Sequence, residues 1–255
     1  MKCFDKIRIY NEEKLDAVYR DKMKHHLLPS VRGFGYWCWK SHIIHTTLKE
    51  LPENAVLLYS DAGCHLNPNG IERLRHYFDE LGKSPLGIKA FTTCSAYIDT
   101  NEKRWTKGDV FDFFNCRNDK KITDTPQIAA TIILCRKCPA ALAFLDEWKS
   151  VVHNYDSLLD DSPSTSHDMN GYIEHRHDQS IFSVLFKLKG GIPLPEGEIE
   201  NFKDEEKDQF PFWALRDKGY KDMRFFSRVK RYLKGVRLRI KIKYESLKAQ
   251  VNISK

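Results

Sequence analysis

Short apolar runs along the chain predict the strands of a sheet. Residues 55–59 (Ala-Val-Leu-Leu-Tyr) and residues 127–135 are dominated by apolar side chains, a pattern typical of strands that are buried on both faces. Residues 88–97 offer a further strand, and residues 6–10 (Lys-Ile-Arg-Ile-Tyr) alternate as a short strand does. Four strands are therefore expected.

Apolar residues at intervals of three and four predict helices between these strands. The pattern is clear in residues 139–153, at Leu142, Leu145, Trp148, Val151 and Val152. Further helices are expected at the chain segments 39–51, 69–81, 105–114 and 178–188. Strands alternating with helices predict an α/β fold with a mainly parallel sheet flanked by helices. In such sheets ligands bind at the carboxyl ends of the strands.

A basic tail sets the end of the chain apart from its body. Residues 216–255 hold 14 Lys/Arg and 3 Asp/Glu and carry +11, whereas the whole chain carries +7, so the first 215 residues carry −4. The apolar spacing of the tail favours an amphipathic helix, while residues 236–244 also alternate as a strand does. We divide the chain into a domain over residues 1–220 and a tail over residues 221–255, which would dock on an anionic surface, either membrane or nucleic acid.

Composition narrows the class of protein. The charged fraction is 30% and the longest apolar run is eight residues, far short of the about 20 that a membrane span needs. No apolar leader follows the start Met-Lys-Cys-Phe-Asp-Lys, so no signal peptide is predicted. Seven irregularly spaced cysteines argue against a disulfide framework and for a reducing compartment.

The first candidate site follows the buried strand at residues 55–59. Asp61 stands directly after that strand, where its carboxylate would be held at the sheet edge and would suit a hard divalent cation that neutralises a diphosphate. Gly63 would let the backbone approach a ligand closely. The structural alternative is that Asp61 only caps the turn.

Three other segments offer ligand-binding side chains. Residues 32–40 crowd aromatic residues, glycines and cations together, and Trp39 and Lys40 would face a base, sugar or phosphate unless they belong to the core. Residues 174–179 open an apolar helix, where Asp178 either caps the helix or faces the reacting group beside Gln179. Near the tail, Arg216 and Lys218 would clamp a diphosphate, or simply begin the basic segment.

Taken together, these segments resemble GT-A type glycosyltransferases, nucleotide-diphospho-sugar transferases of bacterial surface-polysaccharide synthesis. The resemblance covers about residues 5–220 and rests on four stretches: Gly33-Phe-Gly-Tyr-Trp-Cys-Trp-Lys40, Tyr59-Ser-Asp-Ala-Gly63, Gln127-Ile-Ala-Ala-Thr131 and His175-Arg-His-Asp-Gln179. It implies a Rossmann-like GT-A fold and transfer of a hexosyl group from a nucleoside diphosphate sugar, UDP-hexose being favoured, to a saccharide or lipid-linked acceptor. It also implies a retaining reaction in polysaccharide or lipopolysaccharide synthesis.

The resemblance also assigns roles to individual residues. Asp61 corresponds to the first Asp of an Asp-x-Asp motif, and Gly63 stands where the second Asp would be. A divalent cation, Mn²⁺ or Mg²⁺, would therefore need His175 or His177 as a further ligand, or the enzyme would rely on its cations instead. The implied donor contacts are Trp39, Lys40, Asp61, Gly63, Gln127, Ala130, Arg216 and Lys218, and the implied catalytic residues are Asp178 and Gln179.

Two departures keep other functions open. Residues 6–10 correspond to the second strand of a GT-A fold, so the first strand is missing or the start is late, and base recognition would suffer if it is absent. The alternatives are a metal-dependent phosphoesterase or nuclease and a non-catalytic sugar-binding remnant. On balance we expect a cytoplasmic enzyme, peripheral on the inner face of the membrane through its tail, with nucleic acid the less favoured partner.

Overall fold

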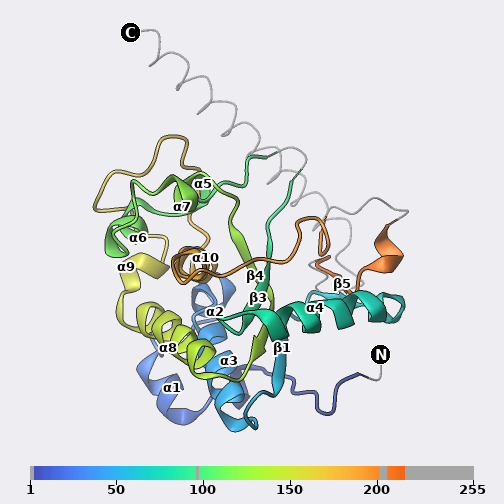
Figure 1. Cartoon of the computed structure of the whole chain (residues 1–255). Coiled ribbons are helices and arrows are strands. Elements are labelled where there is room, and N and C mark those ends of the chain that lie inside the picture. Colours follow the sequence, from blue (N-terminus) through green and yellow to red (C-terminus); the bar gives the residue numbers. More distant parts are fainter. Residues whose placement is uncertain (1–2, 96–97, 201–205, 216–255) are drawn as a thin grey trace, which may run out of the picture.

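The computed structural model describes residues 3–95, 98–200 and 206–215 and shows a mixed α/β fold (Figure 1). The main sheet has three strands in the order β1-β4-β3, with bounds Val56–Ser60, Ile128–Arg136 and Ile88–Thr92. A second, two-stranded sheet pairs β2 (His65–Leu66) with β5 (Phe212–Trp213). The predicted strand at residues 6–10 is wrong, because these residues join no ladder.

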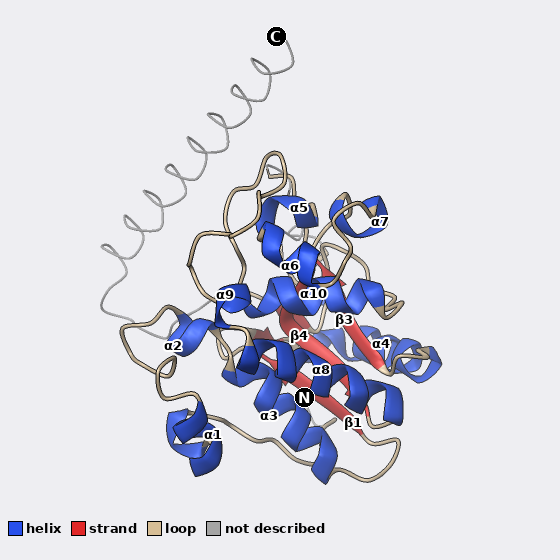
Figure 2. Cartoon of the chain, turned by 90° about the vertical axis from the view of Figure 1, so that its left-hand side faces the viewer, coloured by secondary structure: helices blue, strands red, loops and turns tan. Residues whose placement is uncertain are grey.

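Helices cover both faces of the main sheet (Figure 2). Four helices are long: α3 (Trp39–Glu50), α4 (Ile71–Lys83), α8 (Pro139–Asn154) and α10 (Asp178–Leu188). The short α-helices are α1 (Ala17–Lys22), α2 (Gly33–Tyr36), α5 (Glu102–Trp105), α6 (Gly108–Phe113), α7 (Lys120–Thr123) and α9 (Asp156–Leu159). Single 3-10 turns form η1 (Glu12–Lys14), η2 (Pro68–Gly70) and η3 (Lys207–Gln209).

The four long helices were all predicted, with bounds that differ by a residue or two. The predicted helix at residues 105–114 corresponds to the shorter α6, and the separate helix α5 before it was not predicted. A 3-10 turn precedes α4, and in it the side chain of Asn67 accepts a hydrogen bond from the Asn69 amide. No helix among the described residues is both long and apolar enough to cross a membrane.

Strand β4 separates two apolar cores. Its side chains Ala130, Ile133 and Cys135 belong to the larger core with α3, α8 and α10, while Ala129, Ile132 and Leu134 belong to the smaller core with α4. This burial on both faces explains why the run from 128 to 135 is apolar almost throughout. It also places β4 at the centre of the molecule.

The predicted mainly parallel, Rossmann-like sheet is wrong for the described strands. Both β1 and β3 pair with β4 in antiparallel register. A strand covered on both faces is apolar whichever way its neighbours run, so the hydrophobic pattern did not reveal the direction. Because β4 is antiparallel to β1, its N-terminal half lies beside the C-terminal end of β1, where Asp61 follows.

An irregularity in β4 frees part of its backbone. The ladder to β3 pairs Ile133 with Ala90 and Ile128 with Thr92. Between these two pairs β4 therefore has three more residues than β3. Ala130 lies within this bulge and has no partner in either register. Bulges of this kind redirect backbone groups and side chains near functional sites, and here the bulge leaves the Ala130 amide and carbonyl for side-chain partners.

The segment labelled α2, together with Trp37, is a left-handed turn and not a regular α-helix, and it leads into α3. Five consecutive residues have positive φ angles, namely Gly33 (61°), Phe34 (52°), Gly35 (91°), Tyr36 (53°) and Trp37 (61°). Each non-glycine residue in this region costs about 1–2 kcal/mol. Contacts of the aromatic rings compensate part of that cost, because the Tyr36 and Trp37 rings lie 4.8 and 5.7 Å from the ring of His177.

The Gly33→Ala variant tests this turn. A Cβ at position 33 would lie 2.4 Å from the Trp37 ring, at a φ of +61°, so we expect a loss of at least about 1–2 kcal/mol in the free energy of unfolding. The matched control is Gly82→Ala in α4, where a Cβ meets nothing within 4 Å and helix propensity predicts a gain of up to about 1 kcal/mol. Urea denaturation measures both, and equal effects would contradict the strained turn.

Candidate active site

Residues from four separate segments meet at one end of the main sheet. Asp61 follows β1, Ala130 lies in the bulge of β4, Lys40 lies in the first turn of α3, and Asp178 and Gln179 open α10. All five were predicted site residues. Hydrogen bonds and ion pairs join them into one group.

Lys40 is the link between these segments. Its ammonium Nζ donates to the Ala130 carbonyl at 3.0 Å and lies 3.4 Å from Asp61 Oδ1 and 3.2 Å from Asp178 Oδ2. The residue is only 4% exposed. Burial alone would lower the pKa of Lys40, but the charges of Asp178 and Asp61 outweigh it and hold that pKa above its ordinary value.

This geometry gives Lys40 protein partners, and its predicted contact with phosphate stays a prediction. From a buried position, the Lys40 ammonium group makes one hydrogen bond to the Ala130 carbonyl and ion pairs with Asp61 and Asp178. The sequence shows a cation beside aromatic residues and does not show which carboxylates face it. Lys40 thus fixes the two carboxylates relative to each other.

Asp178 is the buried carboxylate of the pair. Burial is the largest influence and the Asp61 charge acts in the same direction, so that despite the opposing Lys40 charge the pKa of Asp178 is raised to about 6. Its Oδ2 makes the ion pair with Lys40 and no hydrogen bond to any described residue. The Trp148 indole donates to the Asp178 carbonyl at 3.2 Å and fixes the start of α10.

Asp61 is the carboxylate that solvent reaches. Its side chain is 32% exposed, and its Oδ1 accepts a hydrogen bond of 2.6 Å from the Tyr59 hydroxyl. The Tyr59 pKa is raised well above its ordinary value by burial and then by the Asp61 charge. Tyr59 was not among the predicted site residues, although residues i and i+2 of a strand share a face and this spacing was a usable signal.

Gln179 is held against the bulge of β4. Its Oε1 accepts from the Ala130 amide at 3.2 Å, and its Nε2 donates to Gln127 Oε1 at 2.7 Å. Gln179 is half-buried, whereas Gln127 is buried. The geometry thus places Gln127 behind Gln179 and away from a direct donor contact.

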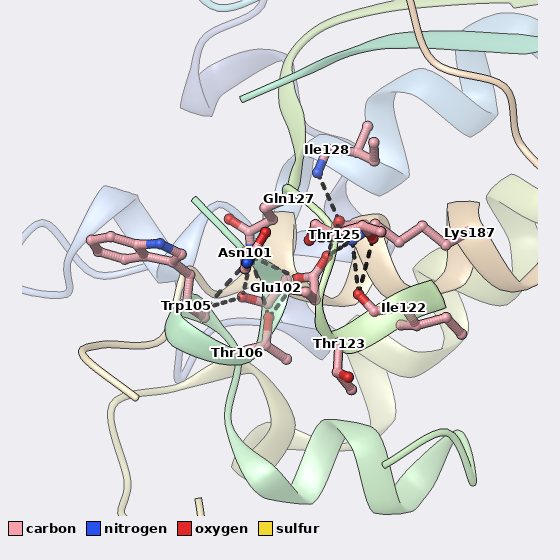
Figure 3. Close-up of polar contacts among 12 residues, drawn as sticks. Asn101, Glu102, Trp105, Thr106, Ile122, Thr123, Thr125, Gln127, Ile128 and Lys187 are labelled. Atoms are coloured by element: carbon pink, nitrogen blue, oxygen red, sulfur yellow. Dashed lines mark hydrogen bonds and ion pairs between the residues drawn. The ribbon is translucent and has the colours of Figure 1, made fainter. Parts of the chain in front are cut away.

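A buried polar network orients Gln127 in turn (Figure 3). Its Nε2 donates to Glu102 Oε1 at 2.9 Å, and Lys187 Nζ donates to Glu102 Oε2 at 2.7 Å. Glu102 has no solvent exposure, so the charge of Lys187 and hydrogen bonds from Thr106 and Ser183 compensate its burial. The sequence offered no signal for Glu102, because a lone Glu at the start of a short helix is ordinarily a surface residue.

The two predicted histidine ligands near Asp178, His175 and His177, differ in how many of their ring nitrogens form hydrogen bonds. His175 Nδ1 accepts from the Lys107 amide at 3.3 Å and its Nε2 bonds the Leu158 carbonyl at 2.8 Å, so both nitrogens are engaged. His177 Nδ1 bonds the Leu159 carbonyl at 2.8 Å, while its Nε2 is buried with no hydrogen bond to a described residue. Burial is the main reason that the pKa values of both histidines are lowered.

The predicted metal set of Asp61, His175 and His177 is not assembled within the described part of the chain. His175 has no free nitrogen, and the three residues do not form a cluster of ligand atoms. The Lys40 ammonium also lies 3.4 Å from Asp61 Oδ1, where its positive charge opposes a cation on that oxygen. These residues therefore do not fit the divalent cation that the sequence predicted.

The remaining predicted donor contacts have simpler surroundings. Trp39 is half-buried against the larger core, and its indole donates to the Gly33 carbonyl at 3.3 Å. Gly63 lies half-buried in the turn after Asp61. Arg216, Lys218 and the whole predicted tail lie outside the described residues.

Comparison with known proteins gives little sequence relationship. No protein-family model matches the chain, and no curated protein matches it. Among solved structures, the apo crystal structure of mouse xyloside xylosyltransferase 1 is similar at a TM-score of 0.39 and 15% identity, over 80% of this chain and 63% of that one. The chain thus spans less than two thirds of that protein's length.

The Lys40→Met variant tests the link between the carboxylates. It leaves the buried Asp178 without its cation, and breaking such a pair costs about 3–5 kcal/mol of unfolding free energy. The loss should be largest at pH 8 and smaller at pH 5, because protonation of Asp178 removes the unpaired charge. Lys103→Met removes a partly exposed pair with Asp124 and should cost less than about 1 kcal/mol. Equal losses of unfolding free energy in the two variants would contradict a structural role for the Lys40 ion pairs.

Proposed function

We propose that this protein transfers a hexosyl group from a nucleoside diphosphate sugar, UDP-hexose being favoured, to a saccharide or lipid-linked acceptor. One observation carries the proposal: solvent-reachable Asp61 and buried Asp178 are bridged by Lys40. Their sequence segments are the ones that resemble glycosyltransferase motifs, and they are far apart along the chain. Convergence of such segments on one site supports a shared function more than any single motif does.

In this proposal Asp61 faces the donor. It follows the end of β1, an outer strand of the main sheet, its Oδ1 is fixed by Tyr59 and Lys40, and its side chain is partly open to solvent. A carboxylate held in this way accepts hydrogen bonds from sugar hydroxyls with little loss of side-chain entropy. Gly63 and Trp39 would complete the donor side of the site.

Asp178 and Gln179 would lie on the sugar face of the reaction centre. Asp178 is fixed at the start of α10 by Lys40 and Trp148, and its negative charge would stabilise positive charge that develops on the sugar. Gln179 Nε2 would present its second proton to a sugar or acceptor oxygen, since one proton binds Gln127. We favour retention of configuration, with Asp178 as a general base in the inverting alternative.

The leaving diphosphate requires positive charge. A bound divalent cation would supply it as a Lewis acid, but Asp61, His175 and His177 do not form a ligand cluster for that ion, and Lys40 is paired with protein groups. We therefore assign this role to Arg216 and Lys218, which lie outside the described residues. The tail over residues 221–255 would hold the enzyme on the anionic inner leaflet, near acceptors of bacterial surface-polysaccharide synthesis.

Asp61→Asn tests the proposal. With purified protein, a panel of UDP- and GDP-sugars and saccharide acceptors, the wild type should release the nucleoside diphosphate. Asp61→Asn should lower kcat/KM by about 100-fold or more, while Asp79→Asn, an exposed carboxylate on α4, should leave it unchanged. No stabilisation of the wild type by any nucleotide in a thermal-shift measurement, together with no product, would contradict the transferase proposal.

The pH dependence of the reaction tests Asp178 separately. With its pKa raised to about 6 by burial, Asp178 becomes a carboxylate only as the pH rises through that value. We expect kcat to increase between about pH 5 and 7 and then level. In Asp178→Asn this rise should vanish together with most of the activity. A profile that keeps its rise near pH 6 in the variant would assign the titration to another group.

A further inference from the structure

Two adjacent histidines and one aspartate form a separate cluster away from the candidate active site. His25 and His26 follow α1, and Asp156 is the first residue of α9. His25 Nε2 lies 3.3 Å from Asp156 Oδ2, and His26 Nε2 lies 2.8 Å from Asp156 Oδ1. One ligand atom from each residue fits within a group whose members all lie within 4.8 Å of one another.

We propose that these three side chains bind one divalent transition-metal ion, with Zn²⁺ as the favoured ion. Two imidazole nitrogens and one carboxylate form a ligand set that suits zinc, whereas Ca²⁺ and Mg²⁺ prefer oxygen alone. With metal–ligand distances near 2.1 Å, tetrahedral geometry spaces the ligand atoms about 3.3–3.5 Å apart. In the structure one ligand atom from each residue lies within 4.8 Å of the other two, so side-chain rotations can bring the three to that spacing.

Access and rigidity both suit a bound ion. The side chains of His25 and Asp156 are each 53% exposed, so an ion and its fourth ligand, a water molecule, can enter from solvent. The His26 side chain is nearly buried and lies edge-on to the Tyr36 ring at 6.1 Å. One fixed and two accessible ligands make a site that is partly preformed.

The ion would connect two segments that flank the candidate active site. His26 packs closely against the left-handed turn. A Cβ added to Gly35 in that turn would lie only 3.0 Å from the His26 carbonyl oxygen. Asp156 begins α9, whose Leu158 and Leu159 carbonyls hold His175 and His177. A metal between His26 and Asp156 would therefore clamp the strained turn to the helix that supports the Asp178 segment. This role does not depend on the proposed transferase activity.

Cobalt titration of the metal-free full chain tests the proposal. Co²⁺ should bind with one equivalent and give the visible bands of a four-coordinate site, without the thiolate charge-transfer absorption that cysteine ligands produce. Zn²⁺ should displace it and raise the melting temperature. His25→Ala and Asp156→Asn should each weaken the affinity at least about tenfold, and both positions are exposed enough that the variants should fold.

His76→Ala is the matched control, because His76 is an exposed histidine on α4, and it should bind as the wild type does. Thiolate charge-transfer bands would place the ion on one or more of the cysteine thiols instead. Binding that is absent at micromolar Co²⁺, or that is unchanged in both His25→Ala and Asp156→Asn, would overturn the proposal. In that event the three side chains form only the hydrogen bonds that the structure shows.

Discussion

The arrangement of the site depends on one buried charge. The Lys40 ammonium lies among the Asp61 and Asp178 carboxylates and the Ala130 carbonyl, at 3.4, 3.2 and 3.0 Å. An ammonium group that is taken out of water must be paired on most sides, or its desolvation destabilises the fold by several kcal/mol. The start of α3, the end of β1, the bulge of β4 and the start of α10 are therefore positioned by the requirement to satisfy Lys40.

Irregular backbone makes this arrangement possible. The bulge of β4 releases the Ala130 amide and carbonyl from the ladder, so that one binds Gln179 and the other binds Lys40. The left-handed turn at residues 33–37 then leads directly into the helix that carries Lys40. Strained or irregular segments persist where the surrounding contacts fix them, and they concentrate at functional sites. Here both segments adjoin the same ion pair.

The asymmetry between the two carboxylates gives them different chemistry. Asp178 is buried with its pKa raised to about 6, whereas Asp61 is partly open to solvent and is held by Tyr59. Environments that separate two acidic groups in this way are typical of sites in which one group faces the ligand and the other holds charge at the reaction centre. Gln127 is fixed by its hydrogen bond to Glu102, which is paired with Lys187. Through its own bond to Gln127, Gln179 is held in place as well.

The hydrophobic pattern by itself determined the three strands of the main sheet, the four long helices and the places of Asp61 and Asp178 at element ends, because side-chain periodicity reports local structure and burial. It did not predict the short strands β2 and β5. Only the tertiary structure decided the antiparallel direction of β4, since burial on both faces makes either direction apolar. It also decided that Lys40 pairs with Asp61 and Asp178, and that both ring nitrogens of His175 are engaged. Those outcomes depend on which distant segments come into contact, and residue spacing along the chain does not reveal such contacts.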